Sequence, residues 1–268
     1  MKKALIKAYA FFRRHILGGR GLSKYKIVKE VNFRLERFLR GPAREYVDYK
    51  NRRFYQDPRG SLSQVFEKYE PETTEFVESN LRAGQTFIDV GASIGWFTLI
   101  ASGLVGETGR VIAVEPNPLS AELLRKNIGY NHCGNVTIVP KAAGSQAGRS
   151  TLYVIADIVT GGSLNDPRSR FDIRDHLMKS EDQTVHEYPV EVIALDSLAA
   201  AADMVKIDVE GGDYATVQGL QSILSRSQPV LIIEQPSADT EKFLSGLNYR
   251  KTFFFDELNA VFTRRDSA

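Results

Sequence analysis

The chain has 268 residues, 43% of them hydrophobic and 25% charged, which is the composition of a globular protein with a sizeable core. No apolar run approaches the roughly 20 residues that span a bilayer, and no signal peptide is expected at Met1–Leu17. The single cysteine, Cys133, excludes an internal disulfide and thiolate zinc clusters and suits a reducing, cytoplasmic compartment, while the net charge is only +2.

That small net charge hides a strong asymmetry along the chain. Residues 1–53 hold 16 Lys and Arg against 4 acids, and the remainder holds 19 against 29. Residues 2–17 and 23–39 each carry an apolar stripe at helical spacing with basic side chains around it. We predict a basic helical extension over residues 1–44. It docks on the acidic body or, through residues 1–40, contacts the anionic inner face of a membrane.

Alternating elements follow in residues 45–268, the predicted main domain. Tyr- and Phe-rich residues 45–56 indicate a hairpin with its turn near Lys50-Asn51, and helices are expected at 63–68 and 71–81. Further helices are expected at 96–100, 118–130 and 213–224, with a short Ala-rich helix after Leu195. Strands are expected at 86–90, 110–115, 136–139, 150–155, 187–195, 204–209 and 230–234, and a closing antiparallel pair at 248–255 and 259–264. This alternation predicts an α/β fold with a mostly parallel sheet and helices on both faces.

The polar stretch from residue 160 to residue 186 interrupts this pattern. It is too long for a simple connection, and it carries Gly161-Gly162-Ser163 near its start. We interpret it as a variable loop that covers the substrate and sets its identity. Its two histidines, His176 and His186, are alternative candidates for a general base.

A glycine turn after the strand at 86–90 predicts a cofactor site. Asp89 is a polar residue near the end of an apolar strand, and Gly91 allows a turn and a close backbone approach. Glu115 ends the next strand about 20 residues later, where a carboxylate accepts hydrogen bonds from both hydroxyls of a ribose. The spacing lacks the third glycine of the dinucleotide motif, which disfavours NAD. It fits S-adenosylmethionine, which has no pyrophosphate.

The second site is the charged end of the strand at 204–209. Strand alternation places Lys206, Asp208 and Glu210 on one side and the apolar residues between them on the other. Charges on a buried strand are costly unless they are paired or used. We therefore predict either a structural Lys206–Asp208 pair or a catalytic group. Asp208 or Glu210 would act as the base, or Asp208 would hold a divalent metal.

Three sequence blocks, FIDVGASIGWFTL, VIAVEPNP and VKIDVEGGD, resemble the FkbM family of S-adenosylmethionine-dependent methyltransferases. Tyr69-Glu70-Pro71 and Gly161-Gly162-Ser163 extend the resemblance to roughly residues 45–235. Two departures are visible. Ser93 stands where the family usually has Asn, and Gly212-Asp213 stands where a small or aromatic residue and Glu are usual.

The resemblance implies a seven-stranded class I methyltransferase sheet of the Rossmann-like type and S-adenosylmethionine as the cofactor. Methyl transfer is expected to a hydroxyl of a sugar, a glycan or glycolipid, or a secondary metabolite. Asp208 would reach the reacting end of the cofactor, beside Lys206 and Glu210. The implied cofactor residues, which run from the methionine through the ribose to the adenine, are Asp89, Gly91, Ala92, Ser93, Gly95, Trp96, Glu115, Pro116, Asn117 and the Lys141-Ala142-Ala143 stretch.

Two other functions compete with this interpretation. The basic N-terminus fits a nucleic-acid or protein N-methyltransferase, but Asp208-Val209-Glu210-Gly211 is not the Asn/Asp-Pro-Pro-aromatic turn of enzymes that methylate amino groups of bases. No RNA-binding motif is present, so no nucleic-acid partner is expected. A non-catalytic protein that binds S-adenosylmethionine would have no reason to keep three charges at a buried strand end.

Overall fold

A computed structural model describes residues 45–56, 69–155, 162–166, 185–253 and 258–264. The chain divides into two units, Met1–Glu45 and Tyr46–Ala268, and the second is the domain considered below. The predicted basic extension, the helix at 63–68 and most of the 160–186 loop lie outside the described residues. Within the described ranges no helix is long and apolar enough to cross a membrane.

The predicted fold class is confirmed by a seven-stranded sheet. Its strands lie in the order β11 (Tyr249–Phe253), β12 (Asn259–Arg264), β10 (Val230–Glu234), β9 (Met204–Ile207), β3 (Thr86–Val90), β4 (Arg110–Val114) and β5 (Val136–Val139). β12 runs antiparallel to both of its neighbours, and the strands from β10 to β5 are parallel to one another. Parallel strands bring their carboxyl ends to one edge of the sheet, which fixes where a site can form.

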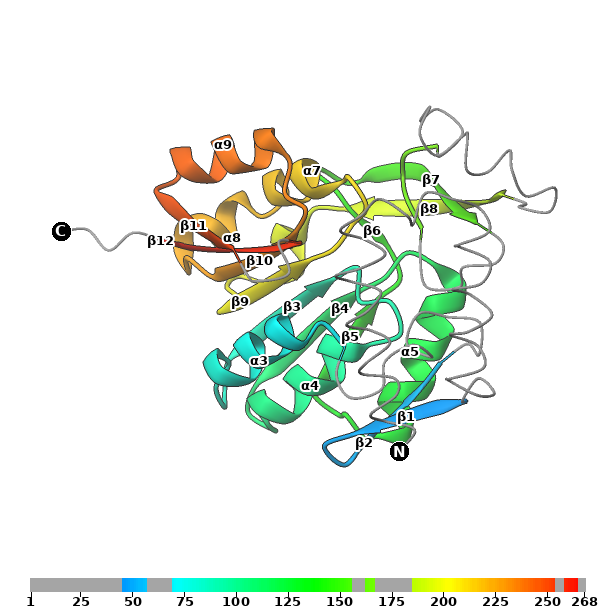
Figure 1. Ribbon diagram of the computed structural model, residues 1–268. Coiled ribbons are helices and arrows are strands. Elements are labelled where there is room, and N and C mark those ends of the chain that lie inside the picture. The colour runs from blue at the N-terminus through cyan, green and yellow to red at the C-terminus, as the bar shows by residue number, and fades with distance from the viewer. Residues whose placement is uncertain (1–44, 57–68, 156–161, 167–184, 254–257, 265–268) are drawn as a thin grey trace, which may run out of the picture. The chain divides into compact units, whose positions relative to one another are not determined.

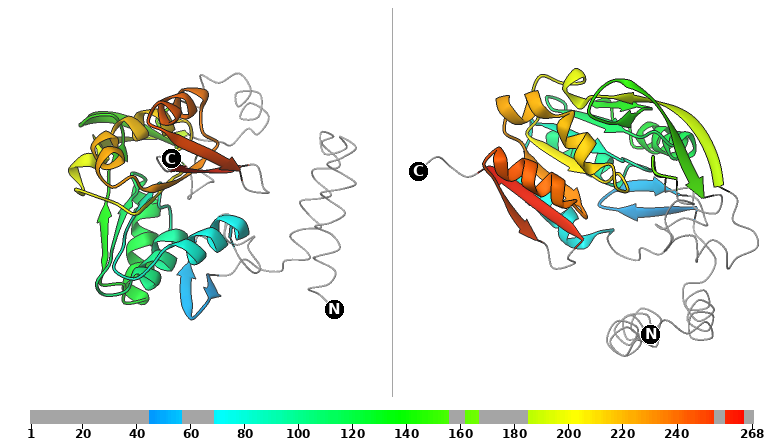
Figure 2. Two further views of the ribbon diagram at one scale, coloured as in Figure 1. Left: turned by 90° about the vertical axis from the view of Figure 1, so that its left-hand side faces the viewer. Right: turned by 90° about the horizontal axis from the view of Figure 1, so that it is seen from above.

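Helices cover both faces of this sheet (Figure 1). One face carries α3 (Pro71–Asn80) and α4 (Trp96–Val105), and the other carries α7 (Asp213–Gln218), α8 (Gln221–Arg226) and α9 (Ala238–Gly246). Alternate strand residues feed two separate cores: Ile88 and Val90 face one core, and Phe87 faces the other. Figure 2 shows the same layers from two further sides. The sheet is therefore buried on both faces, as its apolar strands require.

Two smaller sheets flank the main one. β6 (Ala142–Ala143), β8 (Val185–Ile193) and β7 (Gly148–Ile155) form a three-stranded sheet. β1 (Tyr46–Tyr49) and β2 (Arg52–Tyr55) form the predicted hairpin, which lies beside α5 (Pro118–Tyr130). Lys50 and Asn51 have φ of 44° and 62°, so the two-residue turn has the positive φ values of a type I′ hairpin turn.

The helix expected at 96–100 continues to Val105 as α4, and two other predicted helices differ from the structure. The helix expected at 213–224 is split into α7 and α8, because the Asp196 carboxylate accepts hydrogen bonds from the backbone N–H groups of Ser222 and Ile223 and starts α8 separately. The Ala-rich helix expected after Leu195 is only a short 3-10 helix, η5 (Leu195–Ser197). Its backbone is bonded to the end of α7, where the Asp196 N–H donates to the Gly219 carbonyl.

Candidate active site

The carboxyl ends of β3, β4 and β9 meet at a pocket with about 1080 Å³ of empty space, counting its open mouth. The pocket brings together almost all the residues that the sequence predicted. Its lining includes Asp89, Gly91, Ala92, Ser93, Trp96, Glu115, Pro116, Asn117, Ala142, Lys206, Asp208 and Glu210. Gly95 is not among the lining residues.

The glycine loop between β3 and α4 has two positions that only glycine fits. Gly91 has φ of 78°, and a Cβ there would lie 1.8 Å from the Asp208 carbonyl oxygen. Gly95 has φ of 95°, and a Cβ there would lie 2.5 Å from the Leu124 side chain on α5. The close approach that the sequence suggested at Gly91 is therefore to the neighbouring strand end, and Gly95 lets α5 pack against the loop.

Glu115 sits buried at the end of β4 and is held by backbone groups. Its Oε2 accepts a hydrogen bond from the Ser93 N–H at 2.7 Å, and its Oε1 accepts one from the Asn117 N–H at 2.8 Å. Burial raises the pKa of Glu115 to about 7, although these two N–H groups act in the opposite direction. Each oxygen keeps a further lone pair, so the carboxylate can still accept from two hydroxyls of a ligand.

Asp89 is buried one residue before the glycine loop. Its Oδ2 accepts a hydrogen bond from the Thr98 hydroxyl at 2.6 Å, which orients the carboxylate toward the start of α4. Burial raises the pKa of Asp89 to about 6, and the nearby Lys206 ammonium partly offsets this. Asp89 therefore contributes mainly to the charge balance under the pocket, together with Lys206.

Lys206 and Asp208 form an ion pair at the end of β9. Lys206 Nζ lies 3.0 Å from Asp208 Oδ2, and the side chains are 2% and 22% exposed. Nζ also lies 4.7 Å from the centre of the Phe97 ring on α4. Burial lowers the pKa of Lys206, but the surrounding carboxylates outweigh it and keep the pKa above its usual range. These carboxylates belong to Asp208, Glu70 and Asp89.

Glu234 is a site residue that the sequence prediction missed. It ends β10 one residue beyond the Ile233–Ile207 pair, which places it beside Asp208 on the neighbouring strand. A hydrogen bond with Asp208, together with burial, raises the pKa of Glu234 to about 9. Burial would raise the pKa of Asp208, but Lys206 and Glu234 outweigh it, so the pKa lies below its usual range. Asp208 is thus the carboxyl of the two that favours the ionised form, because the Lys206 ammonium holds it.

Two more residues complete this charged cluster from distant parts of the chain. Glu70, at the N-terminus of α3, has φ of 40°, and its Oε2 accepts a hydrogen bond from Asn259 Nδ2 at 3.2 Å. Asn259 starts β12 and pairs in register with Glu234. Burial raises the pKa of Glu70.

An acid at a strand end was the available sequence signal for Glu234, the same signal that pointed to Glu115.

The stretch after Asp208 departs from the predicted alternation. β9 ends at Ile207, and Glu210 lies in a turn with φ of 38°, where its side chain is exposed at the edge of the pocket. Asp213 faces away from the chemistry: its Oδ2 accepts from the Ser237 N–H and from the hydroxyls of Ser237 and Thr240. Asp213 therefore joins the start of α7 to Ser237, the N-cap of α9. At this position, where the FkbM family usually has Glu, the aspartate has a structural role.

Of the remaining predicted residues, some line the pocket and others do not. Ala142 and Ala143 line the pocket from β6, whereas the neighbouring Lys141 is paired with Glu191 at 2.6 Å. His186 is exposed on β8 and is not among the pocket-lining residues, so its role as a base stays a prediction. His176 lies outside the described residues.

A divalent metal does not fit the donor set that the structure describes. No group of three His, Cys, Asp or Glu side chains within the described ranges could hold a metal ion. Asp208 Oδ2 is instead held by the Lys206 ammonium.

The strand order, the antiparallel seventh strand and the carboxylate after the glycine loop together define a Rossmann-like fold of the class I methyltransferase type. The model of a protein family described as "Methyltransferase FkbM domain" matches residues 89–266, which is about two thirds of the chain. The chain therefore belongs to the FkbM methyltransferase domain family, as the motifs suggested, and S-adenosylmethionine is the cofactor of such enzymes.

Curated relatives match over a shorter stretch. A probable cobalt-precorrin-6B C(15)-methyltransferase from Sulfolobus acidocaldarius is 40% identical over 62 residues, covering 23% of this chain and 32% of that protein. A protein-L-isoaspartate O-methyltransferase from Caenorhabditis elegans is 34% identical over 70 residues, covering 24% and 31%. The chain spans about a third of the length of these relatives.

Solved structures with a similar course of the chain include an FkbM methyltransferase from Methylobacillus flagellatus. It is 17% identical, covers 71% of this chain and 50% of that chain, and has a TM-score of 0.46. An S-adenosylmethionine-dependent O-methyltransferase from Thermotoga maritima is 14% identical, covers 85% and 80%, and has a TM-score of 0.44.

Proposed function

We propose that this protein transfers a methyl group from S-adenosylmethionine to a hydroxyl of a sugar, a glycan or glycolipid, or a hydroxylated metabolite. The observation that carries the proposal is Asp208, an ionised carboxylate that lines the pocket beside the glycine loop and is 3.0 Å from a buried ammonium. Family membership supports methyl transfer in general. We propose a hydroxyl as the acceptor because Asp208 gives the pocket a carboxylate that can take a hydroxyl proton.

The residues of the pocket fit the cofactor. Glu115 offers one remaining acceptor position on each oxygen to the two ribose hydroxyls. Ala142, Ala143 and Leu152 give an apolar wall suited to the adenine, and the loop at Ala92–Ser93 lies on the methionine side. When bound, S-adenosylmethionine supplies a methyl group already activated on a sulfonium, so the protein must chiefly align the acceptor.

Asp208 is the proposed general base. A sugar hydroxyl is a poor nucleophile, and a carboxylate within hydrogen-bond reach can take its proton as the new oxygen–carbon bond forms. Lys206 Nζ donates to Asp208 Oδ2 at 3.0 Å, which orients the carboxylate of the base. Glu210, exposed at the mouth, is the second candidate.

The acceptor would approach past residues 162–166. Gly162 and Leu164 line the pocket, and the Ser163 hydroxyl donates to the Glu210 carbonyl at 3.1 Å. We propose that this segment, with the rest of the 160–186 loop, sets the identity of the acceptor. The pocket wall on this side is rich in carboxyl groups, which favours a neutral, hydroxyl-bearing acceptor over an anionic one.

The test is a transfer assay with S-adenosylmethionine that carries a deuterated methyl group. The full chain is incubated with panels of sugars, glycans and hydroxylated metabolites, and with RNA and protein substrates, and products are read by mass spectrometry. A labelled ether on a hydroxyl, absent with Asp208→Asn, is the expected result. Labelled nitrogen, or no product despite cofactor binding, would contradict the proposal.

A further inference from the structure

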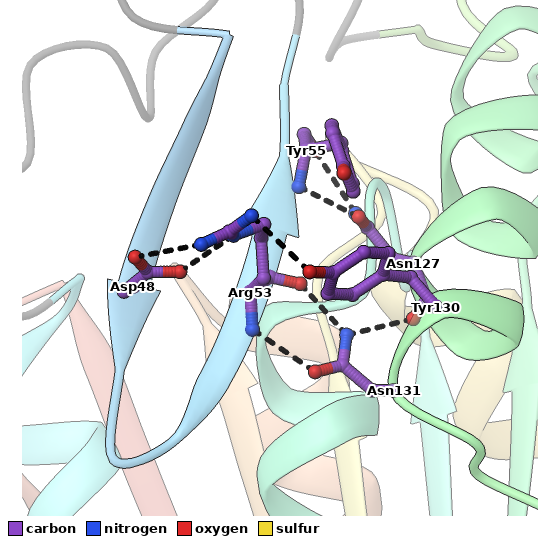
Figure 3. A network of polar contacts seen from close by, with 6 residues as sticks. All are labelled: Asp48, Arg53, Tyr55, Asn127, Tyr130 and Asn131. Atoms are coloured by element: carbon purple, nitrogen blue, oxygen red, sulfur yellow. Dashed lines mark hydrogen bonds and ion pairs between the residues drawn. The ribbon is translucent and has the colours of Figure 1, made fainter.

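The β1–β2 hairpin is held against α5 by two asparagine side chains (Figure 3). The Tyr55 N–H donates to Asn127 Oδ1 at 2.7 Å, and Asn127 Nδ2 donates to the Tyr55 carbonyl at 2.9 Å. One helical turn later, the Arg53 N–H donates to Asn131 Oδ1 at 2.9 Å, and Asn131 Nδ2 donates to the Arg53 carbonyl at 2.7 Å.

The spacing of these two amides explains why they can act together. Four residues of helix rise about 6 Å, and two residues of strand rise about 6.6 Å, so side chains four apart on α5 match alternate residues of β2. Each amide supplies one donor and one acceptor, as a neighbouring strand would. The outer edge of β2 is therefore paired with a helix, and its backbone groups are satisfied.

Only one of the two amides also reaches the glycine loop. Asn127 Nδ2 makes a second hydrogen bond, to the carbonyl of Ile94 at 2.7 Å, and Asn127 is completely buried. The second hydrogen bond of Asn131 Nδ2 returns to α5, to the carbonyl of Asn127 at 2.8 Å. Ile94 lines the pocket and follows Ser93, whose N–H holds Glu115.

The hairpin also supports the pocket through aromatic packing. The Phe54 ring centre lies 4.6 Å from that of Trp96, and the Tyr49 ring centre lies 5.1 Å from it. Trp96 lines the pocket as the first residue of α4, and its Nε1–H donates to the Thr74 hydroxyl at 3.0 Å. Removing the hairpin would expose one side of this indole.

We infer that Asn127 is a positioning residue for the cofactor, and that the hairpin, which precedes the matched residues 89–266, is part of the cofactor site. The inference rests on the proposed binding of S-adenosylmethionine in this pocket. Asn127 links the β2 backbone to the Ile94 carbonyl, and so fixes the glycine loop that lines the pocket. Asn131 holds the same hairpin without touching the loop.

The experiment compares Asn127→Ala with Asn131→Ala in the full chain. Isothermal titration with S-adenosylmethionine should show a dissociation constant raised about tenfold in Asn127→Ala, the effect of about one lost hydrogen bond. Asn131→Ala should change it by less than about twofold, because its contacts end at the hairpin and α5. Equal changes in both variants, or no change in Asn127→Ala, would overturn the inference.

A second readout does not depend on the cofactor. Trp96 is the single tryptophan of the chain, so emission excited where the 11 tyrosines do not absorb reports this wall alone. Acrylamide should quench it more strongly in Asn127→Ala than in Asn131→Ala, and Phe54→Leu, which keeps both amide contacts, should increase quenching directly. Absence of cofactor binding by the unaltered chain would overturn the proposed function, whereas equal quenching in both asparagine variants would overturn the link from hairpin to loop.

Discussion

Two sides of the site, called its first and second walls, can be compared. The first is the glycine loop with the end of β4, and the second is the charged cluster at the ends of β9 and β10, which reaches the pocket through Lys206 and Asp208. The first wall holds its one carboxylate, Glu115, with backbone N–H groups at 2.7 and 2.8 Å. The second wall sets carboxyl groups around a single ammonium, that of Lys206, from four separate segments. A wall made of backbone is pre-organised by the loop, whereas a wall made of balanced charges depends on each member remaining in place.

The largest effect is expected at the charged wall, in the variant Asp208→Asn. This change keeps the shape and removes the proton acceptor, so turnover should fall by about 10²–10⁴-fold, the range for a positioned base. The measurement is the steady-state rate with an acceptor found by the labelling assay. Glu210→Gln is the matched comparison at the pocket mouth. Normal turnover in Asp208→Asn would remove it from the chemistry, and a large loss in Glu210→Gln alone would move the base there.

Lys206→Met should break the charge balance of the same wall. The ammonium is 2% exposed, so its loss leaves carboxylates facing one another without a counter-ion. We expect a loss of about 3 kcal/mol in the free energy of unfolding, the lower end for breaking a buried ion pair, because some of the carboxylates can take up protons. Chemical denaturation measures it. The double variant with Asp208→Asn should recover part of the loss, and strict additivity would argue against the pair.

The backbone-built wall is tested by Glu115→Ala. Losing the acceptor of two ribose hydroxyls should weaken S-adenosylmethionine binding by roughly 1–3 kcal/mol, the scale for hydrogen bonds to a charged group. Titration calorimetry gives the value, with thermal unfolding as a check that the loop keeps its fold. An unchanged affinity would remove Glu115 from the cofactor site.

The same residue gives the wall a dependence on pH. Without ligand, the pKa of Glu115 is about 7, and hydroxyl donors favour the ionised form. Binding should therefore release a proton, and affinity should rise as pH increases through that pKa.

The free energy of unfolding of the ligand-free chain should instead fall as pH increases. Because the folded pKa lies above the unfolded value of 4.5, this contribution is complete below 4.5 and is lost as pH rises through about 7. Glu115→Gln should remove both effects, leaving what Asp89 contributes.

The two walls also differ in how far the sequence predicts them. Local patterns were sufficient for the glycine turn and for Glu115, since each depends on a few adjacent residues. Glu234 and Glu70 join Asp208 only through the order of strands and the position of α3, which local patterns do not contain. The turn at Glu210 was missed for a related reason: strand alternation says nothing about where a strand stops.

The smallest effect is expected at Ser93, back in the glycine loop. This residue has φ of 51°, a left-handed conformation that Asn adopts more readily than Ser and that β-branched residues resist. Ser93→Asn should raise the free energy of unfolding by up to about 1 kcal/mol, and Ser93→Thr should lower it by a similar amount, if backbone strain decides. Because Ser93 holds Glu115 through its N–H, cofactor affinity should change little in either variant. Chemical denaturation of both variants distinguishes an effect of backbone strain from an effect of the space around the side chain. Opposite signs follow from the backbone conformation, whereas a loss in both would mean that the space around the side chain in the pocket sets the stability of this loop.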